Sequence, residues 1–129
     1  MATEPASRHQ PPFVAVVDDD PAVCNSLKFA LELEGLAVRT YTSGAALLRG
    51  NDLKTYGCFV VDQRMPGMSG LELVRELRER GIATPAILIV SEPSVSLSAR
   101  AAEARVPIVE KPFLGNTLIE RIREACGRD

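Results

Sequence analysis

The sequence predicts a single α/β domain in which helices cover both faces of a parallel five-stranded sheet. The chain has 129 residues, 46% of them hydrophobic, which is enough for one core and too little for a second domain. Several predicted strands are continuous apolar runs, as expected of strands buried on both faces. Strand-like and helix-like segments alternate five times, which favours parallel strands joined by right-handed crossovers.

The first predicted strand covers residues 13–17 (FVAVV) and runs directly into three aspartates at 18–20. We expect Asp20 to cap a helix, because an aspartate side chain accepts hydrogen bonds from free backbone N–H groups. Pro21 suits the first turn of this helix, and Gly35 ends it.

The second strand is predicted at residues 36–41 (LAVRTY), where apolar and polar residues alternate. A short helix follows from Ser43 to Leu48. Residues 58–62 (CFVVD) repeat the buried-strand pattern and again end in an aspartate, Asp62.

The loop at residues 65–70 (MPGMSG) leads into a helix with a clear beginning and end. Ser69 and Glu72 have the spacing of a capping box. The helix is predicted over residues 71–80, and Gly81 ends it.

The last third of the chain repeats the alternation. We expect a strand at residues 86–90 (AILIV), a short helix at 94–105 and a fifth strand at 106–111 (VPIVEK). The final helix is recognised by an apolar face made of Leu118, Ile119, Ile122 and Ala125.

Composition limits the possible partners. The formal net charge is -2 and the isoelectric point is about 5.5, so the chain has no basic surface of the kind that binds nucleic acid. Its apolar runs are too short to span a membrane. We therefore expect proteins or small ions as partners, no direct binding to nucleic acid and no membrane contact.

Cysteine and histidine usage predicts a cytoplasmic protein without a zinc site. Cys24, Cys58 and Cys126 are an odd number and form no C-x-x-C pair, and no signal peptide is recognisable. The single histidine, His9, lies in a polar, proline-rich stretch, residues 1–12, that we expect to be a disordered tail.

Chemistry-bearing side chains follow the predicted strands. If the strand order is 2-1-3-4-5, Asp18, Asp19 and Asp62 meet where the order reverses, at the edge that binds ligands in such sheets. Three carboxylates close together favour a cation, and few hard oxygen ligands suit Mg²⁺. Ser91 and Lys111 follow strands four and five, so the set predicts phosphoryl chemistry.

Four segments resemble the response regulator receiver domain of two-component signalling: VVDDDPAV, VVDQRMPGMSGLELV, AILIVS and VEKPF. The run D-x-R-M-P-x-M-S-G resembles receivers that are often fused to helix-turn-helix output domains. The resemblance implies a flavodoxin-like (βα)5 three-layer sandwich over residues 13–129, with strand order 2-1-3-4-5.

The same resemblance implies a role for each acidic residue. Asp62 would take a phosphoryl group from the phosphohistidine of a histidine kinase. Asp19 and Asp62 would bind Mg²⁺ directly, Asp18 would bind it through water, and the backbone carbonyl of Arg64 would be a further ligand.

Further along the chain, the resemblance implies that Ser91 contacts a phosphoryl oxygen, that Lys111 pairs with the phosphate and that the Lys111–Pro112 bond is cis.

Phosphorylation would change protein contacts on the face made by the fourth helix, fifth strand and fifth helix. The implied partners are a sensor histidine kinase or phosphotransfer protein, a downstream protein and, optionally, a second copy in a homodimer. Such a domain signals and is not an enzyme, although it catalyses its own phosphorylation and dephosphorylation.

The chain departs from the family pattern at the output side. Glu92 and Pro93 follow Ser91, where a small residue is usual, and the Glu92 carboxylate could repel the phosphoryl group or narrow its access. Ile108 stands where an aromatic switch residue is common, and the stretch from Ser91 to Lys111 is short. A short or distorted fourth helix is therefore expected.

Two other readings compete with a phosphorylatable, stand-alone receiver. A degenerate receiver would act as a binding module without phosphorylation. A phosphatase of the haloacid dehalogenase type would use the D-x-D of Asp18 and Asp20, with Asp18 as nucleophile. That class usually has a threonine next, whereas Ala22 and Val23 follow here, and no cap insertion is present.

Overall fold

The structure is a computed structural model that describes residues 13–111 and 117–127. The predicted tail, residues 1–12, lies outside the described residues, and so does the peptide bond that joins Lys111 to Pro112. Within the described part, none of the helices is both long enough and apolar enough to cross a membrane.

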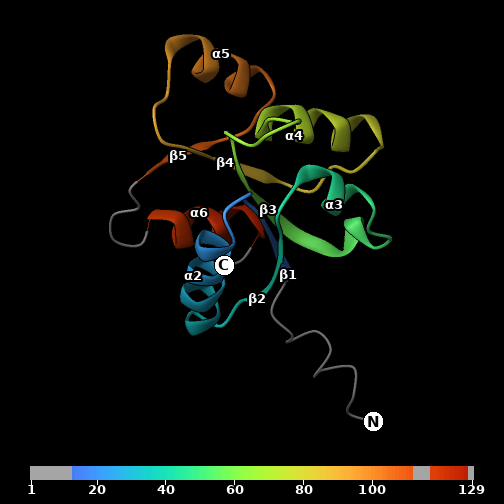
Figure 1. The fold of residues 1–129 in the computed structure, drawn as a ribbon, viewed down its shortest axis with the longest axis vertical. Coiled ribbons are helices and arrows are strands. Elements are labelled where there is room, and N and C mark those ends of the chain that lie inside the picture. Colours follow the sequence, from blue (N-terminus) through green and yellow to red (C-terminus); the bar gives the residue numbers. More distant parts are fainter. Residues whose placement is uncertain (1–12, 112–116, 128–129) are drawn as a thin grey trace.

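The described residues form one parallel five-stranded sheet with the predicted order, β2-β1-β3-β4-β5 (Figure 1). Its strands are β1 (Phe13–Val17), β2 (Ala37–Tyr41), β3 (Tyr56–Asp62), β4 (Ala86–Val90) and β5 (Ile108–Glu110). The order reverses between β1 and β3, so the carboxyl ends of these two strands border the crevice in which such sheets bind ligands.

Helices cover both faces of the sheet and make it the middle layer of a three-layer sandwich (Figure 1). The α-helices are α2 (Pro21–Leu33), α3 (Gly44–Leu48), α4 (Gly70–Glu79), α5 (Val95–Glu103) and α6 (Thr117–Ala125). Apolar side chains of α2 and α6 pack on one face, and those of α3, α4 and α5 pack on the other. The predicted flavodoxin-like architecture is confirmed.

The strands are apolar throughout because both faces are covered. Side chains of β1 alternate between the two cores: Ala15 and Val17 face α3 to α5, whereas Val14 and Val16 face α2 and α6. All four are at most 1% exposed. Burial of such side chains contributes about 1.5–3 kcal/mol each for the larger ones, which makes the strand ends a rigid support for the loops that follow.

The helix boundaries follow the capping signals of the sequence. Asp20 caps α2, and Ser69 with Glu72 forms the predicted capping box of α4. Gly35 and Gly81 follow the helix ends with φ of +90° and +81°, a conformation that costs glycine little.

Three details differ from the sequence-based expectation. β3 begins at Tyr56, two residues before Cys58, because Tyr56 pairs with Phe13 of β1. A 3₁₀ turn, η1 (Leu53–Thr55), precedes β3, and β5 is only three residues long.

The region after Ser91 is short, as expected, yet it folds as a continuous helix. α5 has nine residues and is capped by Ser94, whose side chain accepts a hydrogen bond from the Leu97 N–H. It is followed by Arg105 at φ 60°, where helices usually have a glycine.

Candidate functional site

Three carboxylates meet beyond the ends of β1 and β3. One carboxylate oxygen from each of Asp18, Asp19 and Asp62 lies within 4.8 Å of the others. Asp18 and Asp62 are 4% and 7% exposed, whereas Asp19 is open to solvent. They line a pocket of about 530 Å³. The structure therefore brings together the acidic residues that the sequence predicted to converge.

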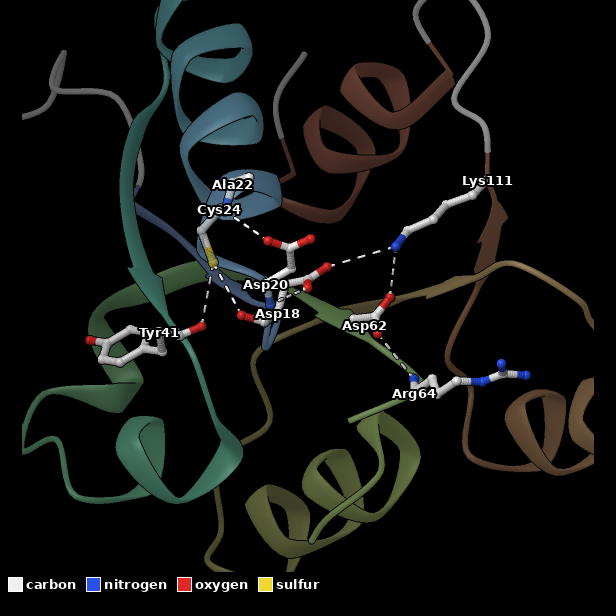
Figure 2. A network of polar contacts seen from close by, with 8 residues as sticks. All are labelled: Asp18, Asp20, Ala22, Cys24, Tyr41, Asp62, Arg64 and Lys111. Atoms are coloured by element: carbon white, nitrogen blue, oxygen red, sulfur yellow. Dashed lines mark hydrogen bonds and ion pairs between the residues drawn. The ribbon is translucent and has the colours of Figure 1, made fainter. Parts of the chain in front are cut away.

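Lys111, directly after β5, extends toward the two buried carboxylates (Figure 2). Its Nζ atom lies 3.1 Å from Oδ1 of Asp62 and 3.8 Å from Oδ2 of Asp18. The Asp18 and Asp62 carboxylates repel one another because they lie in the same cluster. The Lys111 ammonium group, which contacts both, offsets part of that cost. One lysine still faces three carboxylates, so negative charge remains in excess.

Backbone groups hold the first aspartates in separate roles. Oδ1 of Asp18 accepts a hydrogen bond of 2.9 Å from the Asp20 N–H, and Oδ1 of Asp20 accepts one of 2.9 Å from the Ala22 N–H. Asp20 is thus the predicted helix cap and stands outside the three-carboxylate cluster. This observation does not favour the D-x-D phosphatase reading.

Burial raises the pKa of Asp18 above its ordinary value. The Asp20 N–H counteracts this shift, the Asp62 charge adds to it, and the Lys111 ammonium opposes it. A carboxyl group with a raised pKa is one whose negative charge is poorly compensated. The ionised form of Asp18 is therefore destabilised by burial first, and the neighbouring Asp62 charge adds to that cost.

Asp62 is held from both sides. Oδ2 accepts a hydrogen bond of 3.1 Å from the Arg64 N–H, while Oδ1 faces Lys111. The backbone of Arg64 is therefore beside the Asp62 carboxylate, although its guanidinium extends away from that carboxylate (Figure 2).

Ser91 lies directly after β4, is exposed, and lines the same pocket as Asp62 and Lys111. Glu92 follows it at the pocket mouth, and one of its oxygens, Oε1, lies 3.9 Å from Nη2 of Arg64. Every site residue predicted from the sequence thus lines one pocket.

Supporting residues at the pocket were not predicted. The side-chain oxygen of Gln63 accepts a hydrogen bond of 2.9 Å from the Leu71 N–H. The backbone carbonyl of Gln63 accepts one of 3.0 Å from the Gly70 N–H. Cys24 donates its S–H to the Asp18 carbonyl, at 3.3 Å. Gly70 is a visible signal in the sequence for close packing. Nothing in the sequence indicates the contact of the Gln63 side chain or that of the Cys24 thiol.

The donor set fits a divalent cation. Carboxylate oxygens are the ligands that Mg²⁺ prefers, and two charges from a cation would offset the excess negative charge described above. Asp18, Asp19 and Asp62 could hold such an ion, and the exposed side of the pocket leaves room for water ligands.

Comparison with known sequences identifies the family. The model of the response regulator receiver domain matches residues 14–123. The transcriptional regulatory protein FixJ of Azorhizobium caulinodans is 43% identical over 116 residues, which are 89% of this chain and 55% of the relative. DctR of Rhodobacter capsulatus, a C4-dicarboxylate transport regulator, is 36% identical over 110 residues, or 83% and 56%. The chain spans about half the length of these relatives.

Solved structures agree with this result. The structure titled FixJ-N has a TM-score of 0.83 and 37% identity, and the match covers 92% of this chain and 95% of that one. The receiver domain of the Francisella response regulator 1452 has a TM-score of 0.79 and 27% identity, with 90% and 97% covered. The chain therefore belongs to the response regulator receiver domain family of two-component signalling, whose members signal and are not classical enzymes.

Proposed function

We propose that Asp62 accepts a phosphoryl group from the phosphohistidine of a sensor histidine kinase or phosphotransfer protein, in a reaction that requires Mg²⁺. The observation that carries this proposal is the 3.1 Å contact between Lys111 Nζ and Asp62 Oδ1 within a three-carboxylate pocket. A nucleophile, a cation beside it and a set of metal ligands are the parts that phosphoryl transfer needs.

In this reaction a carboxylate oxygen of Asp62 forms a bond to phosphorus while the bond from phosphorus to the donor nitrogen breaks. The leaving imidazole keeps the electron pair of that bond. Asp18, Asp19, Asp62 and the Arg64 carbonyl would hold Mg²⁺, which when bound neutralises phosphoryl oxygens. The Arg64 N–H fixes the orientation of Asp62 by its hydrogen bond to Oδ2.

Lys111 and Ser91 would respond to the product. An acyl phosphate carries close to two negative charges, so it attracts the Lys111 ammonium and accepts a hydrogen bond from the Ser91 hydroxyl. Both residues lie at the ends of strands next to α5, so their movement can shift an equilibrium between two arrangements of the α5–β5–α6 face. We place a downstream protein, or a second copy of the chain, on that face, and the whole reaction in the cytoplasm.

Ile108 is the residue on β5 through which this face would be altered. It is half-buried and packs against the core cluster beneath α5. A branched aliphatic side chain cannot swing between buried and exposed positions with a hydrogen-bonding tip, as a tyrosine can. The output change in this chain therefore depends on displacement of α5 and β5.

Incubation with acetyl phosphate and Mg²⁺, followed by measurement of intact mass, tests the proposal. We expect the wild-type chain to gain the mass of one phosphoryl group and the Asp62→Asn variant to gain none. Asp52→Asn, at an exposed aspartate that precedes η1, is the matched control and should be labelled like the wild type.

Undiminished labelling of Asp62→Asn would contradict the assignment of the acceptor. No labelling of the wild type, under conditions that label a known receiver, would favour the binding module that acts without phosphorylation.

A further inference from the structure

Arg64 and Glu92 form an ion pair at the mouth of the phosphorylation pocket. Arg64 comes two residues after Asp62, and Glu92 comes directly after Ser91. Their side chains are 86% and 83% exposed and approach to 3.9 Å between Nη2 and Oε1. Such an exposed pair adds little to the stability of the fold. Its charges can instead act on ions and phosphoryl donors that enter the pocket.

The pocket lining carries an excess of negative charge. Five carboxylates line it, from Asp18, Asp19, Asp20, Asp62 and Glu92, together with two cations, Arg64 and Lys111. The sum is three formal negative charges. A bound divalent cation reduces this excess to one negative charge. Removal of the Glu92 charge would then make the pocket neutral, so Glu92 decides whether an arriving anion meets a negative or a neutral pocket.

The position of Glu92 also affects Arg64. Figure 2 shows the Arg64 guanidinium extended away from the Asp62 carboxylate. Its Nη2 atom lies 3.9 Å from Oε1 of Glu92. A guanidinium that faces a carboxylate presents less positive charge to an incoming phosphoryl group. Glu92 therefore acts twice against an anion, by its own charge and by neutralising Arg64.

We propose that Glu92 makes the pocket select phosphoryl donors by charge, favouring N-phosphoryl donors with a protonated leaving nitrogen over acyl phosphates. This inference rests on the proposed transfer to Asp62. A phosphorylated nitrogen that carries a proton offsets one of the phosphoryl charges, whereas acetyl phosphate arrives as a dianion. Charges at a pocket mouth change the logarithm of the association rate in proportion to the charge of the ligand.

The size of the effect follows from Coulomb's law at the pocket mouth. One unit charge several ångströms from the donor path, in a largely aqueous medium, changes the rate by about threefold for each unit of donor charge. The ratio of the phosphoramidate rate to the acetyl phosphate rate should therefore fall by about threefold when Glu92 is neutralised.

The experiment compares second-order rate constants for phosphorylation of Asp62 by acetyl phosphate and by phosphoramidate, with Mg²⁺ and at low ionic strength. Glu92→Gln should accelerate the acetyl phosphate reaction about tenfold and the phosphoramidate reaction about threefold. In 1 M salt both gains should shrink toward unity, because the screening length is then about 3 Å.

Three further single variants and one double variant make the result specific. Glu92→Asp keeps the charge and should behave like the wild type. Glu79→Gln removes the same charge at the far end of α4, outside the pocket, and should also leave both rates unchanged. Arg64→Gln should slow both donors, acetyl phosphate more, and should do so more strongly in the Glu92→Gln background, where the guanidinium is unpaired.

Equal acceleration of both donors by Glu92→Gln, or a gain that salt does not reduce, would show a steric effect and overturn the inference. So would unchanged rates. If neither donor labels Asp62 in any variant, the proposed function itself fails and the inference falls with it. A normal Asp62 reaction with an unaltered donor ratio refutes the inference alone.

Discussion

At the scale of single residues, Asp62 depends on the close approach of Gly70, the first residue of α4. A Cβ atom at position 70 would lie 2.5 Å from the Asp62 carbonyl oxygen and 2.7 Å from Cδ1 of Leu88. The Gly70 N–H meanwhile donates to the Gln63 carbonyl. The absence of a side chain at Gly70 thus lets α4 begin against the strand end that carries Asp62.

Gly70→Ala should destabilise the domain and displace Asp62. The methyl group would force backbone atoms of β3 and α4 apart, at a cost of about 1–3 kcal/mol in the free energy of unfolding, measured by urea titration. Labelling of Asp62 by acetyl phosphate should also slow. Gly44→Ala is the control, because its nearest neighbours are flexible ends of Met68 and Leu73, at 3.1 Å or more, and it should lose less stability. Equal stability of Gly70→Ala and wild type would contradict this account.

Residue types alone predicted the main members of the pocket, but not their supports. Asp62 ends a strand and Asp18 and Lys111 directly follow strands, and strand ends in a parallel sheet meet at one edge. The Arg64–Glu92 pair joins two loops that are separated by a whole helix and strand. Its formation depends on side-chain torsions at the surface, for which the sequence has no periodic signal.

At the scale of elements, two tyrosines connect β2 and β3, the strands on either side of β1. Tyr41 ends β2 and Tyr56 begins β3, and their hydroxyl groups are hydrogen-bonded to each other. Their rings meet edge to face at 84°, with centroids 6.4 Å apart. Burial and the Tyr41 hydroxyl raise the pKa of Tyr56 from 10.0 to about 12.

This shift predicts a loss of stability in strong alkali. Because the folded-state pKa of Tyr56 lies above its unfolded value, its contribution is complete below pH 10 and is lost as the pH rises toward 12. Tyr41→Phe removes the second cause and leaves burial, so the pKa of Tyr56 should fall but stay above 10. Tyr56 is then the only tyrosine left in the chain, and tyrosinate absorbance reports it alone. Titration of Tyr56 at 10 or below in this variant would contradict the role of burial.

Element types and most boundaries could be predicted, because apolar periodicity and capping residues act locally. The start of β3 at Tyr56 could not be predicted in this way. Gly57 interrupts the apolar run between Tyr56 and Cys58, and only the pairing of Tyr56 with Phe13 extends the strand to include it. Such pairing is set by the neighbouring strand and has no local signal.

At the scale of the whole molecule, the fold holds three carboxylates together against one lysine. The free energy of folding bears the cost of this repulsion, because the same groups are far apart and solvated in the unfolded chain. A cation that binds the folded cluster and not the unfolded chain would recover that cost.

Mg²⁺ should therefore stabilise the protein. At about a hundred times its dissociation constant, the gain in the free energy of unfolding should be about 2.7 kcal/mol, measured by urea titration at matched ionic strength with NaCl as the reference. Asp19→Asn, at an exposed member of the cluster, should lose most of this gain.

The matched control is Asp20→Asn. Asparagine caps helices as well as aspartate does, and Asp20 lies outside the three-carboxylate cluster, so the stabilisation by Mg²⁺ should persist. An equal response of Asp19→Asn and wild type would show that the ion binds elsewhere.

The sequence by itself determined the α/β class, the order of the elements, the helix caps and the main charged and hydroxyl members of the pocket. These follow from local periodicity, from capping chemistry and from the rule that parallel strand ends share an edge. Only the tertiary structure decided that Lys111 lies nearer to Asp62 than to Asp18, that Gly70 contacts the end of β3, and that Glu92 faces Arg64. Those contacts join residues from separate elements and loops, and their distances are set by how the strands and helices pack together.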